Sequence, residues 1–186
     1  MRIASTLIGI FIMCCTPIGS FAQNQNNLRQ INSGTIYFKS DAPLELIEAQ
    51  SKSLKGIIDT KQRTFAYTVS IESFEGFNSP LQREHFNENY METNLFPKAT
   101  FSGKIIENVD FESDGVYEVR AKGKLNIHGV EQERIIKATL QINGGQMEVH
   151  SKFTVPLTDH NITIPRIVEQ KIATEIYVEI NAQFEN

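Results

Sequence analysis

The sequence predicts a mainly β protein that folds as one eight-stranded antiparallel β-barrel, with one capping α-helix over about residues 80–95 and short helical turns. Three observations support this fold class. Apolar and polar residues alternate with a period of two over most of the chain, turn residues separate the alternating runs, and the alternation breaks at one long segment. Such alternation is typical of an antiparallel sheet with one apolar and one solvated face.

Eight runs carry the alternation. In the run 64–74, for example, Phe65, Tyr67 and Val69 fall on one face, while polar and small residues fall on the other. Long runs joined by short Gly-containing turns favour an up-and-down barrel, because closure removes the exposed edges of the sheet. The other predicted strands are 116–127, 134–142, 146–157 and 171–184, with weaker ones at 35–40, 54–59 and 99–107.

The segment that breaks the alternation begins with a helix signal. Ser79 can serve as N-cap, Pro80 fits the first turn, and Gln82 stands at the capping-box position. The helix is expected to stop before Pro97. A second, shorter helical turn is predicted over residues 43–50.

Residues 1–22 have the layout of a secretory signal peptide. Arg2 gives a positive start, residues 3–13 form an uncharged and mostly apolar run, and Ser20 and Ala22 are the small residues that a signal peptidase reads. We expect cleavage between Ala22 and Gln23 and a periplasmic or secreted protein. The apolar run is shorter than the roughly 20 residues that a membrane span needs, so no span is expected after cleavage.

Both cysteines, Cys14 and Cys15, lie in this segment. They leave open a lipoprotein that is acylated on cysteine. Otherwise the mature chain has no thiol, which excludes disulfides, a Cys nucleophile and thiolate metal sites. The polar residues 23–32 are predicted to be a disordered lead-in, and residues 33–186 are predicted to form a single domain.

Charge argues against a nucleic-acid partner. The chain has 18 Lys and Arg against 22 Asp and Glu, a formal net charge of −4 with mixed signs. Such a balance gives no electrostatic attraction to nucleic acid or to an anionic membrane. The sequence leaves open whether the protein is a monomer or a homodimer.

Two stretches resemble the YceI-like family of exported bacterial proteins. Residues 81–103 (LQREHFNENYMETNLFPKATFSG) resemble the family's helix and following strand, and residues 123–130 (GKLNIHGV) resemble its hairpin. The segments 42–45 and 54–74 also fit, so the resemblance spans about residues 33–184. It implies a lipocalin-like eight-stranded barrel with an apolar cavity and a polyisoprenoid- or quinone-type ligand. Residues 158–167 depart from the family's Arg-x-x-Phe-Gly stretch, so no role of that stretch is carried over.

The helix also holds the most chemistry-bearing side chains. Glu84, His85 and Glu88 place a histidine between two carboxylates, and such a set can ligate a metal or act as acid and base. The other three histidines are scattered and supply no second ligand pair. We therefore interpret this trio as side chains that pin the helix to the barrel through hydrogen bonds, and we expect no catalytic residue and no metal site.

The barrel interior is the more informative feature. Small inward residues, such as Ala121, Gly123 and Ser151, alternate with large ones, which leaves either a cavity or a dry interdigitated core. With the family resemblance, a cavity is favoured. The headgroup is expected at the mouth, near His85, Tyr90 and Arg166. The predicted lining residues are Phe65, Tyr67, Val69, Phe101, Val119, Ala121, Gly123, Leu125, Ile136, Ala138, Leu140, Val149, Ser151, Phe153, Thr174, Ile176 and Val178.

These observations predict a carrier for an apolar isoprenoid- or quinone-type lipid, with no other cofactor and no enzymatic activity. Two alternatives remain. One is a metal-binding protein or hydrolase that uses Glu84, His85 and Glu88. The other is a ligand-free structural module with a filled core.

Overall fold

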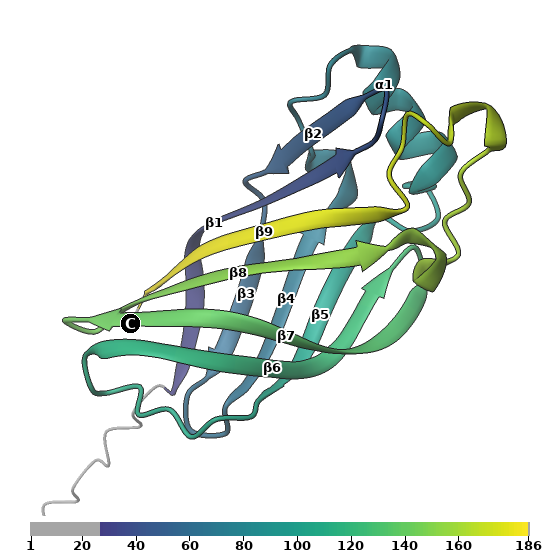
Figure 1. The fold of residues 1–186 in the computed structure, drawn as a ribbon. Helices are drawn as coiled ribbons and strands as arrows, with labels where there is room; N and C mark the ends of the chain where they lie inside the picture. The colour runs from purple at the N-terminus through teal and green to yellow at the C-terminus, as the bar shows by residue number, and fades with distance from the viewer. Residues whose placement is uncertain (1–26, 186) are drawn as a thin grey trace, which may run out of the picture.

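The computed structural model describes residues 27–185, which form one antiparallel sheet closed into a barrel (Figure 1). The predicted signal peptide lies outside the described residues. Within residues 27–185, no helix is long and apolar enough to cross a membrane. The strands are β1 (Leu28–Asp41), β2 (Leu46–Ser51), β3 (Lys55–Asp59), β4 (Thr64–Ser70), β5 (Lys98–Ile105), β6 (Gly115–Ile127), β7 (Val130–Asn143), β8 (Gln146–Pro156) and β9 (Glu175–Glu185).

The nine strands fill eight positions around the barrel because β2 and β3 share one of them. The start of β1 pairs with β3, and its end pairs with β2. On its other side β1 pairs with β9, and this pairing closes the barrel. The register of β1 against β9 shifts between Ile31 and Ser33, which marks a bulge where the long strand bends. The predicted eight-stranded antiparallel barrel is confirmed.

Hairpins join the long strands as their turn residues predicted. The β6–β7 hairpin pairs Ile127 with Val130 across the turn His128-Gly129, whose φ angles of 52° and 72° are those of a tight hairpin turn. Along β6 the buried or half-buried residues alternate with exposed ones, so one face is apolar and the other solvated. The same alternation sets the register of the sheet.

One end of the barrel carries the helical segments, and the other carries the β7–β8 turn and the C-terminus (Figure 1). Helix α1 (Pro80–His85) continues into a π-helical turn, Phe86–Tyr90. We call residues 80–96, which are this helical segment and the turn after it, the lid. Short 3-10 turns cover Ile71–Ser73, Leu157–His160 and Arg166–Val168.

The helical part of the lid ends at Tyr90 rather than near residue 95. The amide of Met91 donates to the carbonyl of Phe86, which closes the wider π turn, and Glu92 then takes a φ of 44° that stops the helix. The start agrees with the sequence: Ser79 Oγ accepts from the Gln82 amide at 3.1 Å, and Pro80 occupies the first turn.

Two predictions from local pattern differ from the structure. Residues 43–50, predicted to be a helical turn, contain most of β2, because pairing with the end of β1 supplies its hydrogen bonds. Residues 28–32, predicted to be part of a disordered lead-in, form the start of β1 between β3 and β9. The remaining strand ends agree with the sequence to within a few residues at most places. Exceptions are β1, β4, β7 and β9: β4 ends at Ser70 instead of residue 74, and β9 begins at Glu175 instead of residue 171.

Candidate functional site

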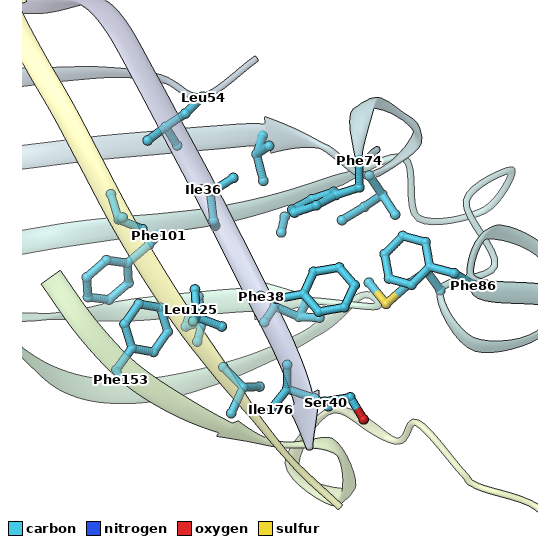
Figure 2. Close-up of a pocket in the computed structure, with 18 of the residues that line it drawn as sticks. Ile36, Phe38, Ser40, Leu54, Phe74, Phe86, Phe101, Leu125, Phe153 and Ile176 are labelled. Carbon is cyan, nitrogen blue, oxygen red and sulfur yellow. The ribbon is translucent and has the colours of Figure 1, made fainter. Parts of the chain in front are cut away.

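A cavity of about 540 Å³ lies inside the barrel. Every strand and the lid contribute to its wall, and Figure 2 shows side chains from both sides of the barrel pointing into a shared space. The volume falls within the range of about 300–1,000 Å³ that is usual for small-molecule sites. Of the two arrangements that the sequence left open, the structure has the cavity. The labelled lining residues are Ile36, Phe38, Ser40, Leu54, Phe74, Phe86, Phe101, Leu125, Phe153 and Ile176.

Arg29 closes the barrel at the end away from the lid. Its guanidinium donates to the carbonyl of Gly145 at 3.1 Å and to the carbonyl of Phe111 at 3.2 Å. The Arg29 residue is only 7% exposed, so these carbonyls stabilise a buried charge. Met147 and Phe184 fill the barrel above it, are fully or almost fully buried, and are not part of the cavity wall. We call this filled end the floor.

The lid covers the other end through a cluster of aromatic rings. Phe86, at the start of the π-helical turn, stacks on Phe38 of β1 with ring centroids 5.3 Å apart (Figure 2). It also contacts Phe77 at 5.0 Å and Phe74 at 6.0 Å. Such ring pairs contribute about 0.5–1.5 kcal/mol each beyond their burial. The aromatic cluster therefore fixes the lid against the rim and forms the upper wall of the cavity.

A histidine at the β6–β7 turn anchors the far end of the lid. His128 Nε2 lies 2.7 Å from the Glu92 carboxylate, and Nδ1 lies 3.1 Å from the carbonyl of His160. The Phe96 ring packs edge-on against the His128 ring at 4.6 Å. The contacts join the two stretches that carry the family resemblance, so those motifs serve to lock the lid onto the barrel.

The wall of the cavity is mostly apolar, and its charged residues lie at the mouth. Glu45, His85 and Lys171 are the charged or titratable lining residues besides tyrosines, and they come from the β1–β2 turn, the lid and the loop before β9. Burial raises the pKa of the Tyr67 and Tyr90 hydroxyls, so both stay protonated. An ionised group inside would lose its hydration without gaining a partner. The interior therefore suits an uncharged, largely apolar ligand.

The predicted lining residues all border the cavity except Gly123 and Thr174. Gly123 faces Gly103 of β5 instead: a Cβ on Gly123 would lie 2.3 Å from the Ser102 carbonyl oxygen. The glycine thus allows two backbones to approach closely and leaves no cavity volume. Thr174 is exposed in the bend before β9 begins.

Two of the three predicted mouth residues are at the mouth. His85 and Tyr90 border the cavity, whereas Arg166 does not. Lys171, five residues further along the same loop, borders it instead. The alternation of residues predicted Lys171 to be the first residue of a strand. The sequence therefore gave no indication that its side chain lies at the mouth.

The trio on the lid makes no hydrogen bond to the barrel among the described residues. Glu84, His85 and Glu88 are exposed, and within residues 27–185 no group of three or more His, Asp and Glu side chains is arranged to hold a metal. Other side chains pin the lid: Gln82 Nε2 donates to Glu45 at 2.8 Å, and Arg83 donates to the carbonyl of Glu72 at 2.9 Å. The expectation that the trio pins the helix is therefore wrong.

Comparison with known proteins agrees with this architecture. The profile of the YceI-like domain matches residues 32–184. A search of the curated proteins found no match.

Several solved structures share the fold. A polyisoprenoid-binding domain from Saccharophagus degradans, implicated in plant cell wall breakdown, superposes with a TM-score of 0.69 at 15% identity, over 84% of this chain and 97% of that one. BcnA from Burkholderia cenocepacia gives 0.67 at 15% identity, over 82% and 96%. A YceI protein from Campylobacter jejuni gives 0.52 at 16% identity, over 69% and 78%. At these identities the likeness shows a shared fold.

Proposed function

This chain belongs to the YceI-like family, and from that premise we propose that it is a carrier that holds one apolar, isoprenoid- or quinone-type lipid inside its barrel. The observation that carries the proposal is the cavity of about 540 Å³ with its mostly apolar wall, closed by Arg29 at one end and covered by the lid at the other. The polyisoprenoid-binding domain that shares this fold supports the same ligand class.

Burial of the ligand supplies the binding free energy. Each methylene removed from water contributes about 0.8 kcal/mol before the costs of association are subtracted. An unbranched or methyl-branched chain can follow the aromatic and aliphatic wall between Phe101, Phe153 and the lid (Figure 2). Because the wall is mostly apolar, affinity should rise with chain length until the cavity is full.

The proposal places the protein outside the cytoplasm and gives it no catalytic role. The layout of residues 1–22 supports export to the periplasm or secretion. A carrier needs no acid, base or nucleophile, and the exposed positions of Glu84, His85 and Glu88 on the lid fit a protein that binds without reacting.

A titration of lipid-free protein tests the carrier function. Farnesene, farnesol and the shorter geraniol should each bind with a stoichiometry of one, and the two C15 compounds should bind more tightly than geraniol. A C15 hydrocarbon that does not bind would contradict the proposal. Decanediol, which carries a hydroxyl at each end of a ten-carbon chain, serves as the polar control and should bind weakly.

A further inference from the structure

The Tyr67 hydroxyl is a hydrogen-bonding group inside the cavity that the protein itself leaves unused. Tyr37 donates to Glu48, Tyr117 to the carbonyl of Ser113, and Tyr177 to Glu179. No other described residue accepts a hydrogen bond from Tyr67, although its side chain is half-buried inside the barrel. Its remaining accessible surface is therefore the surface that faces the cavity. Buried hydroxyls are normally paired, so one that faces an apolar cavity points to a ligand.

The Tyr67 ring lies toward the floor of the cavity. Its centroid is 6.3 Å from that of Phe184, a floor residue, and 5.6 Å from that of Phe65. Gly56, opposite Tyr67 on the neighbouring strand, leaves room for the ring because it has no Cβ. A Cβ there would lie 2.5 Å from the Tyr67 ring. The hydroxyl thus sits on a ring that packs against the floor and against Gly56.

The other hydroxyls of the interior are not equivalent to it. The Ser151 hydroxyl, on β8, already donates a hydrogen bond to the carbonyl of Lys137 at 2.6 Å. Thr68, the next residue on β4, also borders the cavity and its hydroxyl has no hydrogen-bond partner, but its oxygen has no accessible surface for a ligand to contact. Burial raises the pKa of the Tyr67 hydroxyl, so it remains a donor at physiological pH.

We propose, on the basis of the carrier function above, that Tyr67 donates a hydrogen bond to an uncharged oxygen of the ligand, and that the ligand enters headgroup first. A carbonyl or hydroxyl oxygen pairs with the phenol, and the apolar tail extends toward the lid. A phosphate headgroup is excluded from this position because the cavity wall holds no cation near the floor. Arg29, at the floor, does not border the cavity, because its guanidinium donates hydrogen bonds to the carbonyls of Gly145 and Phe111.

The test compares three probes that share a farnesyl-type chain on the wild type, Tyr67→Phe, Tyr90→Phe and Tyr177→Phe. Farnesylacetone has a ketone that only accepts hydrogen bonds, farnesene has no headgroup, and farnesyl phosphate has a charged one. Tyr67→Phe removes one oxygen without changing the ring. Tyr90→Phe makes the same change at the mouth and tests that position for the headgroup, whereas Tyr177→Phe makes it outside the cavity wall and is the matched control.

We expect Tyr67→Phe to bind farnesylacetone about threefold to tenfold more weakly while its affinity for farnesene stays the same. Tyr177→Phe should match the wild type with both probes. Tyr90→Phe should keep the wild-type ratio of the two affinities, and farnesyl phosphate should bind the wild type more weakly than farnesylacetone. Infrared spectra should show the ketone band shifted to lower frequency in the wild type and in Tyr90→Phe, and unshifted in Tyr67→Phe.

An unshifted ketone band in the wild type would overturn the proposal, and this measurement needs no variant. Loss of ketone affinity in Tyr90→Phe instead of Tyr67→Phe would place the headgroup at the mouth and overturn it as well. In both cases intact farnesene binding would leave the carrier function standing. Absence of farnesene binding in the wild type would contradict the carrier function itself.

Discussion

Filling the cavity with a side chain should weaken lipid binding without unfolding the barrel. Ala121 on β6 is half-buried and borders the cavity, so its accessible surface faces the empty space. A phenyl ring there would fill part of the cavity of about 540 Å³. At about 24 cal/mol per Å³ of cavity, filling roughly 100 Å³ with the ring would stabilise the fold by at most about 2.4 kcal/mol. If the interior were packed instead, the larger side chain would destabilise it by about 1–3 kcal/mol.

The assay measures the free energy of unfolding in urea and the affinity for farnesene on the same Ala121→Phe protein. We expect an unchanged or higher free energy of unfolding together with a clearly lower affinity. Ala66→Phe is the matched control, because Ala66 is exposed on the outer face of β4, and it should keep its affinity. Destabilisation of lipid-free Ala121→Phe by more than about 1 kcal/mol would refute the reasoning, since it would mean that the interior is already full.

Three further predictions concern the frame around the cavity. Arg29→Ala should lower the free energy of unfolding by about 2–4 kcal/mol in urea denaturation, because the carbonyls of Gly145 and Phe111 lose a charged donor; a loss under about 0.5 kcal/mol would contradict the floor assignment. Gly123→Ala should cost about 1–3 kcal/mol, because its Cβ would meet the Ser102 carbonyl; calorimetry that finds a gain would show that the strands are not so close. Hydrogen bonds from Arg120, chiefly from its backbone amide and next from its guanidinium, lower the pKa of Glu107. The pair therefore stabilises the fold above the unfolded-state pKa of glutamate, and this stabilisation is lost as the pH falls through the lower folded-state pKa. NMR titration should show a higher Glu107 pKa in Arg120→Ala, and an unchanged value would be inconsistent with the pairing.

The alternation of apolar and polar residues was sufficient to predict the barrel, because each strand's partner buries the face that the pattern marks. The same alternation was sufficient to predict most of the lining residues. Phe65, Tyr67 and Val69, for example, point inward as a period of two requires. The segment 43–50 failed because its inward positions, Ile47 and Ala49, make too short an apolar run to show the period. Its strand conformation depends on pairing with the end of β1.

Features that depend on distant residues had no local signal. Arg29 appeared to belong to a polar lead-in, yet it bonds to a carbonyl 116 residues away. Gly123 had the right period for a cavity residue, and only the approach of β5 shows that no space is left there. The anchor of the lid, in which His128 meets Glu92, likewise joins segments that lie 36 residues apart.

The central claim is that the barrel holds an uncharged lipid in the cell. Native mass spectrometry of the protein, purified without detergent from the periplasm or medium of a bacterium that exports it, tests this most directly. We predict a fraction of the protein carrying one lipid per chain, which solvent extraction releases as an isoprenoid- or quinone-type molecule, and a much smaller fraction in Ala121→Phe. Protein that is wholly free of lipid and takes none up from added farnesene, or that carries a metal ion instead, would contradict the account.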